Sequence, residues 1–225
     1  MSTNEIIMET YAVDSFNKLI LRDDSGAGAV YIEQGSTEGL QIEASHDLLR
    51  RVEVDVRNGT LYIRLGGSWL ERLSDKLTTS LSRPKIIYRV QAKELQFVDL
   101  ACAHLLQIPS LKTDEMRMKL CGVVQAEVDA LEIGRLELKH SGMGALRLSG
   151  SVKSQDIQLS GSGLYDAHAL QSENVVISIS GTAEARVYVT QSLDVHIRGM
   201  GKVEYRGEPH VHQQIFGMGG IVRKQ

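Results

Sequence analysis

Apolar and polar residues alternate with a period of two through the second half of the chain, and this alternation recurs every 18 to 20 residues. It flanks a set of evenly spaced glycines on both sides. These glycines are Gly122, Gly142, Gly161, Gly181, Gly199 and Gly217, with Cys102 at the equivalent position of an earlier repeat. Alternation at period two is typical of a β-strand with one buried face. Each repeat is therefore predicted to contain two or three short strands joined by turns.

The apolar positions form columns when the repeats are aligned on glycine. The column two residues before the glycine contains Leu100, Leu120, His140, Leu159, Ile179, Ile197 and Ile215. The column four residues after it contains Leu106, Ala126, Leu146, Tyr165, Ala185, Val203 and Ile221. Repeats of this length with few helix signals stack as coils of a parallel β-helix, because one coil alone cannot bury its inner face. The pattern predicts an all-β solenoid of about seven or more coils, with 18–20 residues per coil.

The glycines mark one corner of each coil, in segments such as Ser141-Gly-Met-Gly144 and Ser160-Gly-Ser-Gly163. Glycine at a corner either adopts a positive φ or allows two backbones to approach closely. A phosphate-binding loop needs a helix directly after its glycines, whereas here another strand follows each Gly-x-Gly. We therefore interpret the glycines as structural.

The outward column five residues after the glycine alternates in charge. It contains Glu127, Arg147, Asp166, Arg186 and Glu204. Opposite charges on successive coils favour in-register stacking, although an exposed pair contributes only tenths of a kcal/mol.

The first 95 residues are less regular. Residues 1–13 are expected to be a tail, residues 14–95 to form irregular strands and a capping helix, and residues 96–225 to form the regular coils of the same single domain. Strands are predicted at residues 16–21, 29–32, 40–44, 51–56 and 60–65. The Asn58-Gly59 turn predicts a hairpin that pairs Val52, Val54 and Val56 with Leu61, Ile63 and Leu65. Residues 25–28 resemble another glycine corner, so the solenoid is expected to begin early in a distorted form.

One short helix is predicted at residues 69–77, because Ser68 and Glu71 form a capping box. Trp69, Leu70 and Leu73 lie on one face of this helix. The helix either covers an open end of the solenoid or presents these residues to a partner.

Composition narrows the possible partners. The 225 residues are 42% hydrophobic and carry a net charge of −3 that is spread along the chain. This charge gives no support to nucleic-acid binding, and no apolar stretch is long enough for membrane insertion. The first residues lack the features of a secretory signal, which favours a cytoplasmic location. Cys102 and Cys121 fall in neighbouring columns that face opposite sides of a strand, so we expect two reduced, partly buried thiols.

Few residues are candidates for chemistry, and no catalytic residue or cofactor is predicted. His140 interrupts an apolar column and is expected to be buried, bonded to the backbone of a neighbouring coil. His210 and His212 share one face of a strand, with His196 one coil earlier, but two histidines without a suitably spaced carboxylate make only a weak metal site. Carboxylates do not recur in the columns that β-helix polysaccharide enzymes use, and Tyr165, Tyr188 and Tyr205 lie in different columns.

The chain resembles the bacterial family of unknown function described as putative auto-transporter adhesin, head GIN domain. The resemblance rests on residues 16–20, on residues 48–65 with their Asn-Gly turn, on the Ser-Gly-x-Gly corners, and on the ending at residues 203–209 and 217–220. It implies a right-handed parallel β-helix, often in an envelope or exported protein, without an established activity.

These observations predict a non-enzymatic scaffold or interaction module. Its partners would be another protein or a second copy of the chain in a homo-oligomer, and the contacts would involve the ends of the solenoid, where strand edges are unpaired. The alternative is a polysaccharide-binding or polysaccharide-active β-helix protein.

Overall fold

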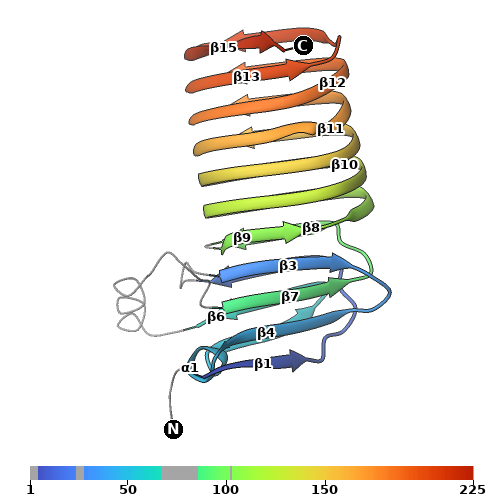
Figure 1. The fold of residues 1–225 in the computed structure, drawn as a ribbon, viewed down its shortest axis with the longest axis vertical. Helices are drawn as coiled ribbons and strands as arrows, with labels where there is room; N and C mark the ends of the chain where they lie inside the picture. Colours follow the sequence, from blue (N-terminus) through green and yellow to red (C-terminus); the bar gives the residue numbers. More distant parts are fainter. Residues whose placement is uncertain (1–4, 24–27, 67–85, 102, 225) are drawn as a thin grey trace.

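The computed structural model describes residues 5–23, 28–66, 86–101 and 103–224, with the side chains of 103 and 104 excepted. Within these ranges the chain forms a 15-stranded sheet wound into a β-solenoid of about six turns (Figure 1). The solenoid prediction is confirmed. Cys102, at the glycine position of the first aligned repeat, and the predicted helix at residues 69–77 lie outside the described residues.

Parallel strands build the regular part of the stack. They are β8 (Phe97–Ala101), β9 (Ala103–Ile108), β10 (Leu111–Leu159), β11 (Ser162–Ile179), β12 (Thr182–Ile197), β13 (Met200–Arg206), β14 (His210–Ile215) and β15 (Met218–Arg223). All pairings between these strands are parallel, with Ile157 opposite Ile177 and Ile177 opposite Val195. Residues of one sequence column therefore lie directly above one another.

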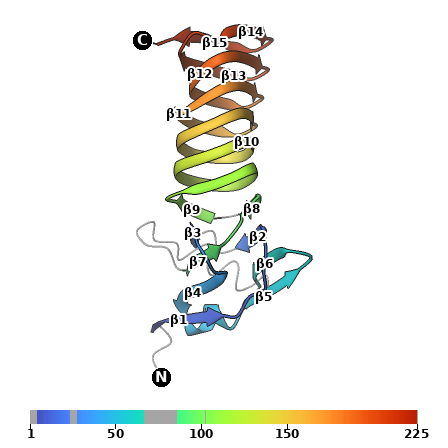
Figure 2. The same ribbon diagram turned by 90° about the vertical axis from the view of Figure 1, so that its right-hand side faces the viewer.

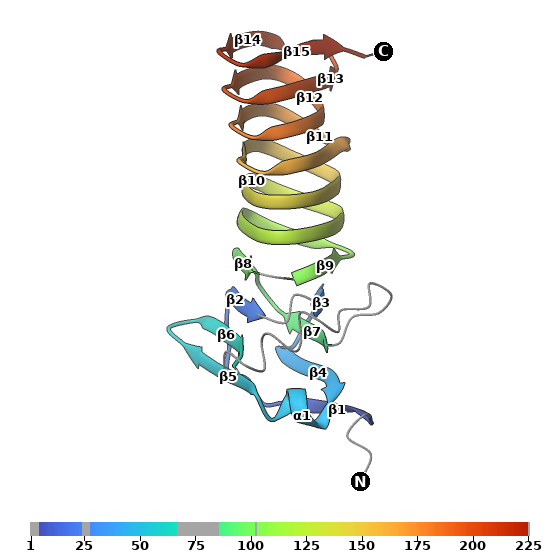
Figure 3. The same cartoon turned by 90° about the vertical axis from the view of Figure 1, so that its left-hand side faces the viewer.

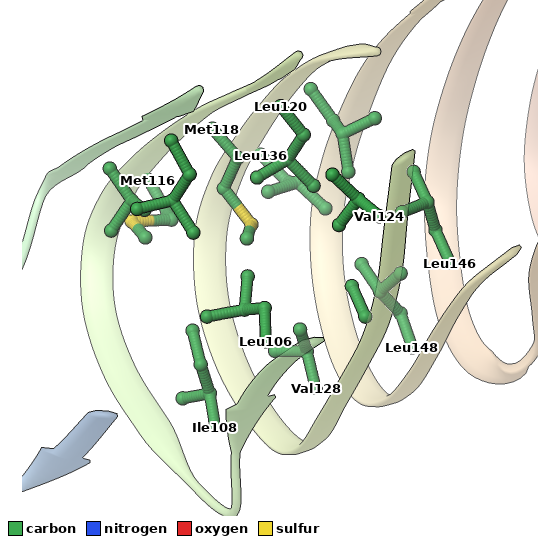
Figure 4. Close-up of a cluster of buried hydrophobic side chains, with 14 of the residues drawn as sticks. Leu106, Ile108, Met116, Met118, Leu120, Val124, Val128, Leu136, Leu146 and Leu148 are labelled. Atoms are coloured by element: carbon green, nitrogen blue, oxygen red, sulfur yellow. The ribbon is translucent and has the colours of Figure 1, made fainter. Parts of the chain in front are cut away.

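The stacked columns form the core. Figure 4 shows Leu106, Leu120, Val124, Leu146 and neighbouring side chains from successive coils filling the space inside the solenoid. From Leu100 to Ile197, every member of the column two residues before the glycine is buried. The alternation seen in the sequence is thus the alternation between the inside and the outside of the coil.

Close packing of the backbone explains the recurring glycine. A Cβ atom added to Gly161 would collide with the backbone of Gly142, and one added to Gly181 would collide with Gly161. Neither Gly161 nor Gly181 has a φ in the left-handed region. Of the two reasons offered by the sequence, close approach between coils is therefore the one that applies at these positions.

The N-terminal strands do not stack in chain order. They are β1 (Ile6–Tyr11), β2 (Lys18–Asp23), β3 (Gly28–Gln34), β4 (Gly39–Ser45), β5 (Val52–Arg57), β6 (Thr60–Leu65) and β7 (Ile86–Ala92). Strands β2 and β3 pair in parallel with β8 and β9, so the solenoid begins early, as expected. On their other sides β2 and β3 pair with β6 and β7, which follow them in the sequence.

Antiparallel strands form this end of the molecule. Strand β4 pairs antiparallel with both β7 and β1, and the short helix α1 (His46–Leu49) buries Leu48 and Leu49 beside them. The expected tail of residues 1–13 therefore contains β1, which the sequence pattern did not predict. The β5–β6 hairpin, in the predicted register, extends to one side (Figures 2 and 3).

Candidate functional site

The C-terminal end of the solenoid is open among the described residues. There β14 pairs only with β12 and β15 only with β13, so the outer edges of both strands are unpaired (Figures 2 and 3). No further coil covers their inward positions. As a result, Ile215 is 36% exposed, whereas Ile197 directly below it in the same column is fully buried.

Apolar side chains collect at this end. Phe216 is 78% exposed and Met218 69%, and Val211 and Val222 are also exposed. Together with Ile215 they form what we call the C-terminal apolar end. The edges of β14 and β15 contain no proline, and β14 also lacks lysine and acidic residues. Natural sheet edges are usually protected by such residues, so this edge is available for strand pairing.

The candidate metal ligands lie on the outer face near the same end. His210 and His212 point outward from β14, and Asp194 of β12 is the register partner of His212. His196 Nε2 lies 3.3 Å from Asp194 Oδ1. A carboxylate therefore does lie beside these histidines, which the sequence reasoning missed because it did not align Asp194 with His212 of the next coil. Even so, the described residues hold no group of three or more His, Cys, Asp or Glu side chains gathered as a metal site requires.

His140 takes the position predicted for it. Its ring is buried, and Nδ1 lies 3.2 Å from the Leu120 carbonyl oxygen of the preceding coil. Nε2 is also buried and has no hydrogen-bond partner. Burial lowers the pKa of His140, because the charged ring would lose its hydration, and the contact with the Leu120 carbonyl opposes this shift only in part. This geometry fits a neutral core histidine.

The predicted charge column is seen as ion pairs around Arg186. Its guanidinium lies 3.8 Å from the Asp166 carboxylate on the coil below and 3.7 Å from Glu204 on the coil above. Ion pairing with Glu184, and then with these two carboxylates, raises the pKa of Arg186. The column therefore links three successive coils.

The two cysteines and the predicted partner contacts have different outcomes. Cys121 is a free thiol and is exposed, so its expected partial burial was wrong: the residue lies just before the glycine on the outer side of the corner. Cys102 lies outside the described residues. Trp69, Leu70 and Leu73, the predicted partner contacts, also lie outside them.

No helix among the described residues is long and apolar enough to cross a membrane. The stacked parallel coils place the chain among the β-solenoid proteins. A family model matches residues 15–209, and the chain belongs to that family, described as putative auto-transporter adhesin, head GIN domain. The resemblance drawn from the sequence is thus confirmed. None of the curated proteins matches the chain.

Solved structures share the fold over nearly the whole chain. A putative adhesin from Bacteroides fragilis has 22% sequence identity and a TM-score of 0.87, covering 98% of this chain and 97% of the other. A putative adhesin from Parabacteroides merdae has 21% identity and a TM-score of 0.68, with the same coverage. A putative lipid binding protein from Parabacteroides distasonis has 19% identity and a TM-score of 0.70, again with the same coverage. At such identities the likeness concerns the fold.

Proposed function

We propose that this chain is a non-enzymatic interaction module of an adhesion-related protein in an envelope or exported setting, and that it self-associates through its C-terminal apolar end. The observation that carries the proposal is the open terminal coil. Within the described residues, β14 and β15 each present an unpaired edge, with exposed apolar side chains beside them. The family membership supports the adhesion-related and envelope parts of the proposal.

A second copy of the chain fits this end better than an unrelated strand. Strands β14 and β15 belong to the same terminal coil and lie on its opposite sides (Figure 3). A two-fold axis perpendicular to the solenoid reverses both strands at once, so each would meet a strand of the second copy in antiparallel orientation. One symmetric contact would pair both edges and continue the core across the interface. A single added strand would leave the other edge open.

Sedimentation velocity over a range of concentrations tests the proposal. The wild-type chain is expected to shift from monomer towards dimer as concentration rises. The double variant Val211→Lys, Ile215→Lys is expected to remain monomeric, because each substitution places a charge at an inward position of the edge. Ile6→Lys, an exposed apolar residue at the opposite end, is the matched control and should behave as wild type. A wild-type chain that remains monomeric at every concentration would contradict the proposal.

A further inference from the structure

A row of polar side chains crosses the outer face of the sheet near the N-terminal end. Backbone register places Thr10 of β1 beside Gln41 of β4, and Gln41 beside Arg89 of β7. Arg89 is the register partner of Tyr31 of β3, which in turn lies beside Gln107 of β9. The chain neighbours of Tyr31 and Arg89 within their strands are buried. The row therefore faces outward, although its members come from five separate segments of the sequence.

Two adjoining hollows meet at Tyr31. One has a volume of about 640 Å³ and is lined by Tyr31, Gln41 and Arg89 among others. The other has a volume of about 260 Å³ and includes Tyr31 and Gln107. Glu33 also lines both hollows. Together they form a depression with an aromatic ring at its centre and carboxamides on both sides.

The Tyr31 side chain is held in place by its neighbours. The Arg89 guanidinium carbon lies 5.7 Å from the centre of the Tyr31 ring, within the range of a cation–π contact. Arg89 also donates a hydrogen bond to Glu43 Oε2 at 3.0 Å, which fixes the guanidinium. The ring is half-buried and belongs to β3, which lies between β7 and β9 in the row. Such a pre-positioned aromatic side chain loses little freedom when a ligand binds.

We propose that this depression binds a neutral glycan chain. An aromatic ring offers an apolar platform to the face of a sugar ring. Carboxamides both donate and accept hydrogen bonds, as sugar hydroxyls do, and Gln41, Gln91 and Gln107 all line the hollows. These donors and acceptors lie beside an apolar ring, and they can pair with the hydroxyl groups of a neutral sugar.

The charge of the depression argues against an acidic glycan, and the pairing of its strands argues against a peptide. The hollows contain the carboxylates of Glu33, Glu38, Glu127 and Asp129 but only one guanidinium, so an acidic glycan would be repelled. Strands β4, β7 and β3 are paired on both sides, so the main chain of a peptide finds no free edge at Tyr31. These three strands lie at the other end of the molecule from β14 and β15 (Figure 2), so the depression is separate from the proposed self-association surface.

Calorimetric titration with cellohexaose, chitohexaose and maltohexaose tests the inference, with polygalacturonate as the acidic comparison. At least one of the three neutral oligosaccharides should bind the wild-type chain more tightly than polygalacturonate does. Tyr31→Ala should weaken this binding by about tenfold or more, because the platform is lost. Tyr31→Phe should retain the binding, since the ring remains. Tyr62→Ala removes an exposed tyrosine from the β5–β6 hairpin and is the matched control.

Several results would overturn the inference. These are no binding of any of the three neutral oligosaccharides to the wild-type chain, tighter binding of polygalacturonate, or equal losses in Tyr31→Ala and Tyr62→Ala. A change in sedimentation of Tyr31→Ala without a change in glycan binding would instead mark the row as a protein interface. If Tyr31→Ala fails to fold, Gln107→Ala serves as the second variant and should weaken binding several-fold through loss of a hydrogen-bonding amide.

Discussion

Replacing Gly161 by alanine adds only one methyl group, but it is expected to destabilise the solenoid strongly. An added Cβ atom would lie well inside the 3.0 Å that real Cβ atoms keep from neighbouring atoms, against the carbonyl oxygen and amide nitrogen of Gly142. The obstructing atoms belong to backbone, so no side chain can move aside. The two coils must therefore separate locally.

The cost follows from this separation. The added Cβ atom would lie 1.8 Å from Gly142 O, so restoring a 3.0 Å contact needs a separation of more than about 1 Å, which breaks the 3.0 Å hydrogen bond from Ser160 N to His140 O. Losing one or two such bonds costs about 1–2 kcal/mol, and crowding a packed site costs about 1–3 kcal/mol more. We expect the free energy of unfolding to fall by about 2–4 kcal/mol.

Urea denaturation followed by far-ultraviolet circular dichroism measures this change. Gly220→Ala is the matched control, because a Cβ atom at Gly220 would have no neighbour within 4 Å and its φ is not in the left-handed region. The control should match wild type or exceed its stability by up to about 1 kcal/mol. If Gly161→Ala lies within about 0.5 kcal/mol of wild type, backbone approach between coils is not the reason for the glycine column.

Three further predictions concern single side chains. Because burial lowers the pKa of His140, the folded chain binds a proton at this ring less readily than the unfolded chain does. The contribution of His140 to the free energy of unfolding should therefore be constant above about pH 6.5. Below that pH it should fall by at most about 1.4 kcal/mol per pH unit. His140→Leu should reduce the difference in urea midpoint between pH 7.5 and pH 5, and an unchanged difference would contradict the assignment. Tyr165→Phe should lower the free energy of unfolding by about 1–2 kcal/mol, because the Tyr165 hydroxyl donates a hydrogen bond to the buried Gln155 side chain. This loss should be smaller when Gln155 is also replaced by methionine. Arg186→Gln should lower the free energy of unfolding by at most about 1 kcal/mol, and by less in high salt, because salt screens its ion pairs. A larger loss of stability, or one that does not depend on salt, would show that the charge column does more than align the coils.

The surfaces proposed for binding differ in how far the sequence could reveal them. The open end was expected in general terms, since any solenoid has unpaired edges at its ends. Val211 and Ile215 occupy inward positions of the terminal coil, and their exposure follows from the absence of a further described coil above them, because their register partners Leu193 and Ile197 are buried. Tyr31 belongs to no regular column, so no repeat drew attention to it.

The sequence by itself determined the period of the coils, the direction of each regular side chain and the hairpin at Asn58-Gly59. These features follow from local alternation and from turn residues, which act within a few positions of one another. The tertiary structure decided which strands are neighbours in the first third of the chain. There, β3 lies between β7 and β9, and β4 lies between β1 and β7, in an order that differs from that of the sequence. Only this long-range pairing brings Gln41, Arg89, Tyr31 and Gln107 into one row, because no local pattern specifies which distant strand will complete a hydrogen-bonded edge.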